Sequence, residues 1–299
     1  MLDLTPLPES VLTEGRAALA RLDALATHHD YRVTCGANVK WRAFGSGKPL
    51  VLVHGGHGNW THWVRNIEAL AAFRAVWVPD LPGYGDSDAL PRDAGFEDLI
   101  AATLESLDGL VGASTEVDVT GFSFGGVVAS TLANRRPVSS LALVGSAGHG
   151  GKRRPQRELL NWKKAEADDE RRALFDANLK SFMLYDPRHA DSLALTVYEQ
   201  ACLQTRFRSK DVSLASDLAV LLKSAEVNPL LLWGTQDVTS ADPQGFSDLL
   251  NAQGVHHRFG LIPDAGHWAQ FEAADEVNRR LCEYFSQASP GVYGRKAST

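Results

Sequence analysis

Short apolar runs recur along most of the chain, and segments with helical spacing separate them. Continuous apolar runs are typical of strands that are buried on both faces of a parallel sheet, whereas strict alternation is typical of a strand with one exposed face. From these patterns we predict strands over Val39–Phe44 (alternating), Leu50–Val53, Ala75–Val78, Val117–Thr120, Leu141–Val144, Leu230–Trp233 and His257–Ile262.

Apolar residues spaced three and four positions apart predict the helices. We expect helices over Ser10–Ala26 (with Ser10 as its N-cap), Trp63–Phe73, Phe96–Val111, Val127–Asn134, Gln244–Ala252 and Ala273–Phe285. Strands that alternate with helices at this spacing indicate βαβ units. The predicted fold class is therefore α/β, with a mostly parallel central sheet flanked by helices.

One segment departs from this alternation. Residues 152–223 contain 14 Lys and Arg and 11 Asp and Glu, a net charge of +3, whereas the whole chain of 299 residues carries a formal charge of −6. The segment also has few strand-like runs. We therefore expect a separate, mostly helical unit here, opposite in charge to the rest of the chain.

Composition excludes several classes of protein. The longest stretches without a formal charge, Pro49–Val64 and Val119–Asn134, contain Gly and polar residues, so neither predicts a membrane span. The cysteines Cys35, Cys202 and Cys282 are widely spaced and odd in number, which predicts neither a disulfide framework nor a metal site. No secretory signal is visible, so we expect a cytoplasmic protein. The acidic balance argues against nucleic-acid binding. We expect a small-molecule substrate and no cofactor, and we leave a homo-oligomer open.

The strongest local motif is the glycine-flanked serine in Gly121-Phe122-Ser123-Phe124-Gly125-Gly126. It follows a predicted strand and opens a predicted helix. Glycines allow the sharp turn that holds a serine in a strained backbone conformation, and a helix N-terminus favours developing negative charge. In this context Ser123 is the candidate nucleophile.

A serine hydroxyl is a poor nucleophile, so it needs a base and an orienting acid. Asp237 and His267 each directly follow a predicted strand, in the order serine, acid, histidine. Asp264 is a rival acid, but its place three residues before the histidine favours a role in ending the strand. The loop Gly145–His149 offers no carboxylate. We therefore predict Asp237 as the acid and His267 as the base.

The third requirement is a pair of N–H donors for an oxyanion. His54-Gly55-Gly56 ends a buried strand in a glycine-rich turn, which lets the backbone approach a ligand closely. The predicted donors are the N–H groups of Gly56 and of Phe124, the residue after the nucleophile.

With these elements the chain resembles the α/β-hydrolase superfamily. The resemblance is carried by His54-Gly55-Gly56, the Asp80–Ser87 segment, the Ser123 turn, Asp237 and Gly266-His267-Trp268. The resemblance covers roughly Val39–Phe285 and implies a hydrolase core at 31–150 and 226–288, with a helical lid at 151–225 inserted after the sixth strand. From the sequence pattern we expect an N-terminal helix within 1–30 and a flexible tail at 289–299. The Asp80–Ser87 segment shapes a turn, and we assign it no catalytic role.

Within the superfamily the identity of the nucleophile limits which reactions are expected. A serine at this position disfavours haloalkane dehalogenases and epoxide hydrolases, which use an aspartate. His267-Trp268-Ala269-Gln270-Phe271-Glu272 is similar to the matching stretch of the meta-cleavage product hydrolases, which split a C–C bond in vinylogous 1,5-diketo acids. That resemblance implies that Trp268 lines the pocket and that Arg206 or Arg208 holds a substrate carboxylate.

Two departures from that family keep carboxylic ester hydrolysis as a competing reaction. Phe122 replaces the usual Asn before the nucleophile, and His57-Gly58-Asn59-Trp60 replaces a Gly-Pro-Gly run. Gly55, Trp60 and Phe122 complete the predicted substrate-binding set. An apolar pocket is expected from Trp60, Trp63, Phe122, Phe124, Phe182, Met183, Tyr185 and Trp268.

Two other function classes stay open. Some proteins of this superfamily bind ligands without catalysis, but they have a degraded triad, whereas all three members are present here. Cofactor-free haloperoxidases, which carry out perhydrolysis, share the Gly-Phe-Ser-x-Gly-Gly pattern, but they usually lack so large an insertion.

Overall fold

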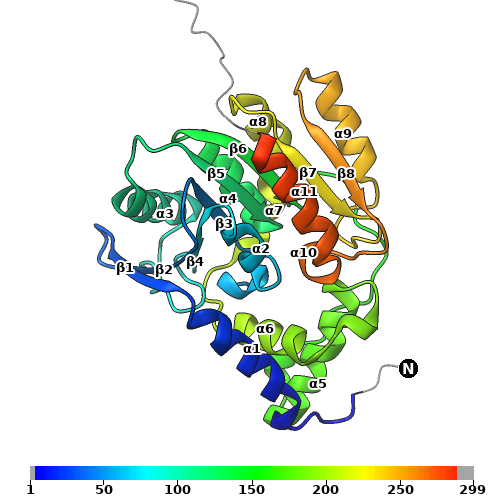
Figure 1. Cartoon of the computed structure of the whole chain (residues 1–299). Helices are drawn as coiled ribbons and strands as arrows, with labels where there is room; N and C mark the ends of the chain where they lie inside the picture. The colour runs from blue at the N-terminus through cyan, green and yellow to red at the C-terminus, as the bar shows by residue number, and fades with distance from the viewer. Residues whose placement is uncertain (1–3, 288–299) are drawn as a thin grey trace, which may run out of the picture.

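The computed structural model describes residues 4–287 and contains a central eight-stranded sheet with helices on both faces (Figure 1). The first three residues and the predicted flexible tail lie outside the described residues. The strands follow the order β1-β2-β4-β3-β5-β6-β7-β8. Pairings β1–β2 and β2–β4 are antiparallel and the others are parallel. The predicted α/β class and mostly parallel sheet are therefore confirmed. The strands are β1 Thr27–Arg32, β2 Asn38–Phe44, β3 Pro49–Val53, β4 Ala75–Pro79, β5 Val117–Phe122, β6 Val138–Val144, β7 Leu230–Gly234 and β8 Arg258–Ile262.

The continuous apolar strands are explained by two separate cores. In β3, Leu50 and Leu52 face one core, while Val51 and Val53 face the other. The first core contains α1, α2 and α11, and the second contains α3, α4, α8 and α9. Because both faces of the sheet are covered, every position of the central strand β3 is apolar. The helices are α1 Thr13–Asp23, α2 Ile67–Ala71, α3 Phe96–Val111, α4 Phe124–Ala133, α5 Asp168–Asn178, α6 Ser192–Leu203, α7 Ser209–Ala215, α8 Leu218–Ser224, α9 Pro243–Ala252, α10 Ala269–Glu272 and α11 Ala274–Gln287.

The structure corrects three sequence-based details. Strand β1 was not predicted, because its sequence Thr-His-His-Asp-Tyr-Arg is polar and lies at the sheet edge. The predicted helix from Trp63 is a 3₁₀ turn, Trp60–Trp63, followed by the shorter α2. Ser10 is not the N-cap of α1, because it lies inside a preceding 3₁₀ turn and Leu12 occupies the cap position without a side-chain bond.

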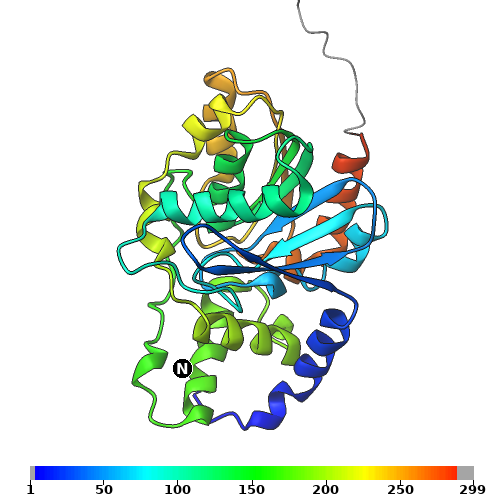
Figure 2. The same ribbon diagram turned by 90° about the vertical axis from the view of Figure 1, so that its left-hand side faces the viewer.

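Between β6 and β7 the chain forms the inserted segment, residues 151–225. Its helices α5 and α6 lie with α1 in a layer below the sheet, and both views show this arrangement (Figures 1 and 2). Helices α7 and α8 instead pack against the core helix α4. The role of the segment as a lid stays a prediction.

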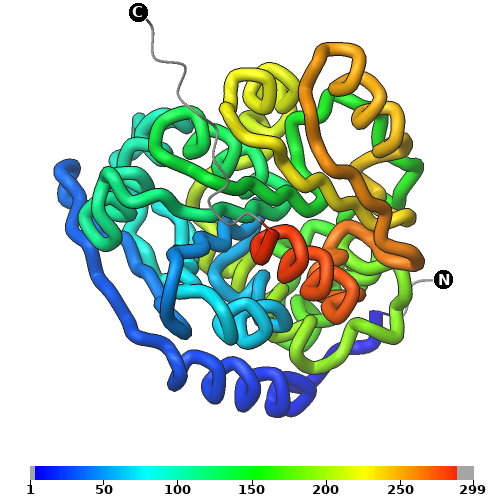
Figure 3. Tube along the Cα trace, turned by 45° about the horizontal axis from the view of Figure 1, so that its top comes forward, coloured from blue at the N-terminus to red at the C-terminus, as the bar shows by residue number. Residues whose placement is uncertain are grey.

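The N-terminal helix is attached to the inserted segment as well as to the sheet. The backbone N–H of Gly15 donates to Ser192 Oγ at 2.9 Å, and a Cβ at Gly15 would overlap the backbone of α6. From α1 the trace then runs directly into the edge strand β1 (Figure 3). Helix α1 therefore connects the sheet edge with the inserted helices.

Candidate active site

Ser123 lies at the junction of β5 and α4 in a strained backbone conformation. Its φ of 52° and ψ of −119° lie in a region that non-glycine residues rarely adopt. A Cβ at Gly125 would overlap the carbonyl oxygen of His54, and one at Gly126 would overlap the side chain of Ser146. The glycines are therefore needed for close packing beneath the turn. Helix α4 begins at Phe124, three residues earlier than predicted, so Ser123 occupies its N-cap position.

His267 connects Ser123 with Asp237. The Nε2 atom of His267 lies 2.9 Å from Ser123 Oγ, and its Nδ1 atom lies 3.0 Å from Asp237 Oδ2. A carboxylate accepts hydrogen bonds but does not donate them, so Nδ1 carries the proton. The Nε2 atom is then free to accept the proton of the serine hydroxyl.

Asp237 is fully buried and its carboxylate is held from two sides. Besides His267, the backbone N–H and the hydroxyl of Thr239 each donate to Asp237 Oδ1 at 2.7 Å. Burial opposes ionisation, but the attraction of His267 and these hydrogen bonds outweigh it, so the pKa of Asp237 lies below its usual range. The rival Asp264 lies in a left-handed turn with φ of 51°, and its N–H bonds to Thr235 Oγ1.

The two predicted oxyanion donors lie beside the serine. Gly56, Phe124 and Ser123 all line one cavity, and within residues 4–287 neither the Gly56 nor the Phe124 N–H donates a hydrogen bond. At the first residue of a helix the N–H has no intrahelical acceptor and lies at the positive end of the helix dipole. The side chain of Ser209, from α7, covers the Cα of Gly56 and leaves no room for a larger residue.

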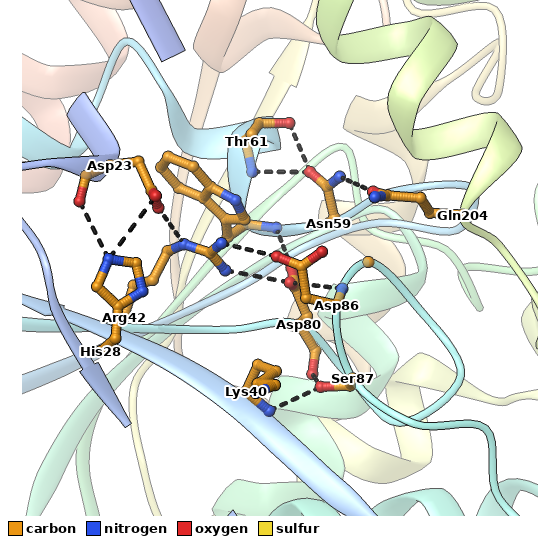
Figure 4. Close-up of polar contacts among 12 residues, drawn as sticks. Asp23, His28, Lys40, Arg42, Asn59, Thr61, Asp80, Asp86, Ser87 and Gln204 are labelled. Atoms are coloured by element: carbon orange, nitrogen blue, oxygen red, sulfur yellow. Dashed lines mark hydrogen bonds and ion pairs between the residues drawn. The ribbon is translucent and has the colours of Figure 1, made fainter. Parts of the chain in front are cut away.

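A buried carboxylate, that of Asp80, holds the loop that contains Gly56 by a hydrogen bond to its backbone. Asp80 Oδ1 accepts the N–H of Trp60 at 2.8 Å, and Asp80 Oδ2 accepts from Arg42 Nη1 at 3.2 Å. Figure 4 shows Arg42 between Asp23, Asp80 and Asp86. Burial raises the pKa of Asp80, and Arg42 opposes that shift. This arrangement agrees with a structural role for the Asp80–Ser87 segment.

Two buried histidines hold Gly55. His54 Nδ1 donates to Gly55 O at 2.8 Å, and His54 Nε2 accepts the N–H of Leu81 at 3.0 Å. His62 Nδ1 accepts the N–H of Gly55 at 3.2 Å. Burial lowers the pKa of His54 to about 4 and that of His62 well below its usual value, so both rings are neutral at pH 7. The glycine turn at Gly55 is thus held by hydrogen bonds with neutral histidine rings.

A cavity of about 740 Å³ opens over Ser123. One part of its wall is apolar and comes mainly from the inserted segment, with Leu160, Trp162, Phe182, Met183, Tyr198 and Cys202. Burial raises the pKa of Cys202 to about 12, so it is a neutral thiol. Another part is basic, with Arg153, Arg157 and Lys210, and Glu158 is the one acidic residue that lines the cavity. The cavity therefore combines an apolar wall with positive charge.

The predicted substrate-binding residues divide into two groups. Phe122 lines the cavity, but Gly55, Trp60 and Trp268 do not. Trp60 packs against Phe44 and under Arg42, whereas Trp268 is fully buried and donates its Nε1–H to His62 O at 3.0 Å. These two tryptophans pack under the loops of the site and do not line the cavity. Of the other aromatic and apolar residues expected in the pocket, Phe124, Phe182 and Met183 line it, while Trp63 and Tyr185 do not.

The two arginines predicted to hold a carboxylate also lie away from the cavity. Arg206 donates to the backbone carbonyls of Gly85 and Ser87, so its guanidinium stabilises the turn that contains these two residues. The Arg208 side chain is 91% exposed and its nearest acidic partner is Asp211, at 3.9 Å. The arginines that do line the cavity are Arg153 and Arg157. No sequence motif marked them, because an extended segment without helix or strand brings them there.

Comparison with known proteins shows the family to which the chain belongs. Residues 50–280 match the alpha/beta hydrolase family model, so the chain belongs to that family and is a hydrolase. It is 28% identical over 276 residues to the 2-hydroxymuconate semialdehyde hydrolase of Pseudomonas sp. (strain CF600), covering 86% of this chain and 93% of that protein. It is 29% identical over 270 residues to the dihydrolipoyllysine-residue acetyltransferase component of the acetoin cleaving system of Pseudomonas putida, covering 83% of this chain and 67% of that protein.

A solved structure shows the same fold. The naproxen esterase of Bacillus subtilis matches with a TM-score of 0.71 and 19% identity, over 94% of this chain and all (100%) of that one. Within residues 4–287 no helix has the length and apolar character that a membrane span requires, and no group of three or more His, Cys, Asp or Glu could hold a metal ion.

Proposed function

We propose that the protein is a serine hydrolase that cleaves a carbonyl substrate through an acyl-enzyme. The observation that carries this proposal is the hydrogen-bonded series from Ser123 Oγ through His267 to the buried Asp237. The serine lies on a strained turn at the wall of a cavity, with two unused N–H groups beside it.

In the first step His267 Nε2 takes the proton of Ser123 as Oγ attacks the substrate carbonyl. Asp237 stabilises the imidazolium that forms, because its carboxylate stays ionised. The N–H groups of Gly56 and Phe124 hold the oxyanion, and such a donor typically contributes a factor of about 10²–10³ to turnover. His267 then protonates the leaving group, and water hydrolyses the acyl-enzyme.

The cavity indicates the kind of substrate. Its apolar wall suits an alkyl or aryl group, while Arg153, Arg157 and Lys210 suit a carboxylate. Within residues 4–287 none of these three side chains takes part in an ion pair or hydrogen bond, so each is available to a ligand. We therefore propose an amphiphilic small molecule with one anionic end.

Two reactions fit this site. Ester hydrolysis needs only the triad and the oxyanion donors. Cleavage of a C–C bond in a vinylogous 1,5-diketo acid needs a further step, protonation of the dienolate carbon before the bond breaks. The relative named 2-hydroxymuconate semialdehyde hydrolase favours the second reaction. Departures at Phe122 and in the His57–Trp60 run favour the first.

A parallel assay tests the proposal and separates the two reactions. The purified protein and its Ser123→Ala variant are given p-nitrophenyl acyl esters and a meta-cleavage dienoate. The reaction with the higher kcat/KM is the function, and both activities should vanish in the variant. Turnover of neither substrate class, or full activity of Ser123→Ala, would contradict the proposal.

We also propose that the protein acts in the cytoplasm. Cys35, Cys202 and Cys282 are all free thiols in the structure, and free thiols persist in a reducing compartment. Fractionation of cells with an antibody against the protein checks this location.

A further inference from the structure

A strap, residues 149–154, leads from β6 into the inserted segment and lies along the loop that contains Asp237. The N–H of Arg154 donates to Val238 O at 3.0 Å, and the N–H of Ala241 donates to Lys152 O at 2.8 Å. His149 Nε2 lies 3.1 Å from Thr239 O. The strap therefore follows the acid loop, residues 235–241, over most of its length.

The Arg154 side chain adds two more bonds to the same loop. Its Nε donates to the main-chain carbonyl of Asp237 at 3.2 Å, and its Nη2 donates to Thr235 O at 2.8 Å. A guanidinium presents several donors in a rigid plane, so it can hold two carbonyls at once. A lysine has a single ammonium on a flexible stem and would hold them less firmly.

The opposite side of the acid loop is hydrogen-bonded to the segment that leads into His267. The N–H of Gln236 donates to Ala265 O at 2.9 Å, and the N–H of Thr235 donates to Ile262 O at 2.9 Å. The acid loop is thus held between the histidine loop and the strap. If the strap were released, one side of the acid loop would lose its partners.

We propose that Arg154 is a positioning residue that fixes the Asp237 carboxylate opposite His267 by holding the acid loop from the strap. Through this contact the start of the inserted segment stabilises the position of the acid in the catalytic triad. The inference rests on the proposed roles of Asp237 and His267. Arg154 does not itself line the cavity, whereas its neighbour Arg153 does.

The test compares Arg154→Gln and Arg154→Lys with the wild-type protein. Displacement of a catalytic group by about 1 Å can lower turnover by about 10²-fold, so we expect Arg154→Gln to lower kcat by about 10- to 100-fold. Its KM for a neutral p-nitrophenyl ester should change little, because such a substrate does not depend on the cationic side chain of Arg153, which lies in the strap. Arg154→Lys should recover part of kcat. Lys164→Gln is the matched control, an exposed cation of the inserted segment whose side chain has no partner within residues 4–287, and it should keep wild-type kinetics.

A second measurement does not depend on turnover. In proton NMR, a histidine Nδ1–H that is bonded to a carboxylate gives a strongly downfield signal, which His267→Gln identifies by its loss. We expect this signal to be lost or broadened in Arg154→Gln and retained in Lys164→Gln. If neither substrate class is turned over by the wild-type protein, the proposed function fails, but the NMR comparison still tests the strap.

Three results would overturn the inference. The first is wild-type kcat in Arg154→Gln. The second is a lower kcat with an intact downfield signal, since the loss would then not act through Asp237. The third is an effect confined to KM. If Arg154→Gln does not fold, Arg154→Lys is measured alone, and unchanged kcat together with an unchanged signal overturns the inference.

Discussion

The hydroxyl of Thr239 donates a 2.7 Å hydrogen bond to Asp237 Oδ1, on the same carboxylate that faces His267. The Thr239 hydroxyl also lies 3.2 Å from His267 Nδ1. It therefore stabilises the ionised form of the acid and limits the positions that the carboxylate can take.

From this contact we expect Thr239→Val to lower kcat by about 10-fold, because a hydrogen bond to a charged group contributes about 1.5–3 kcal/mol. The backbone N–H of residue 239 still bonds to the carboxylate, so activity is not abolished. Thr239→Ser keeps the hydroxyl and should retain most of the activity. Steady-state kinetics on a p-nitrophenyl ester measure both variants, and equal losses in the two would show that the hydroxyl is not responsible.

Loss of a triad member should have a much larger effect. We expect Ser123→Ala and His267→Ala each to lower kcat by about 10⁴- to 10⁶-fold, because the members act as a unit. The double variant should be no worse than either single one. Near-additive losses in the double variant would mean that the two residues act independently.

Recognition of an anionic substrate should depend on the basic wall of the cavity. Replacement of both Arg153 and Arg157 by Gln should raise KM for a substrate with a free carboxylate by about 10-fold, since each charge-assisted hydrogen bond contributes about 1.5–3 kcal/mol when fully formed and less at an exposed site. KM for a neutral p-nitrophenyl ester should change little. Arg208→Gln is the control, because its side chain is exposed outside the cavity. A rise in KM confined to Arg208→Gln would restore the family-based assignment.

Stability should fall in mild acid because the pKa of buried His54 is lowered to about 4. In the unfolded chain a histidine titrates near pH 6.5, so between about pH 6.5 and 4 only the unfolded state binds this proton. The contribution of His54 is fully present above that window and is lost as pH falls through it, by up to about 3 kcal/mol.

Urea unfolding at pH 7.5 and pH 5 measures this loss. His54→Asn should lower the free energy of unfolding at pH 7.5 and should make its pH dependence shallower. Some dependence should remain, since burial also lowers the pKa of His57, His62 and His149. Identical pH dependence in the variant would contradict the assignment of this proton to His54.

The sequence was informative where local chemistry dictates local structure. Strand β3 reads as a continuous apolar run because both of its faces are buried, and the glycines around Ser123 follow from backbone contacts that no Cβ could enter. Asp237 and His267 could be placed because each follows a parallel strand, and the carboxyl ends of such strands meet at one edge of a sheet.

The cavity wall could not be predicted in the same way. Arg153 and Arg157 lie in a segment without helix or strand, so no periodicity or motif in the sequence marks them as residues that line the cavity. Arg206 was expected to bind substrate because of the resemblance to the meta-cleavage product hydrolases, yet its guanidinium donates hydrogen bonds to backbone carbonyls. Strand β1 is polar at the sheet edge and gives no hydrophobic pattern.

The central claim is that Ser123 is a nucleophile activated by His267. Incubation of the folded protein with a fluorophosphonate probe, followed by mass spectrometry of the intact chain and its peptides, tests it most directly. We predict one adduct per chain, located on Ser123, that is absent in Ser123→Ala and strongly slowed in His267→Ala. No labelling of the folded wild-type protein, or labelling that persists in Ser123→Ala, would contradict the claim.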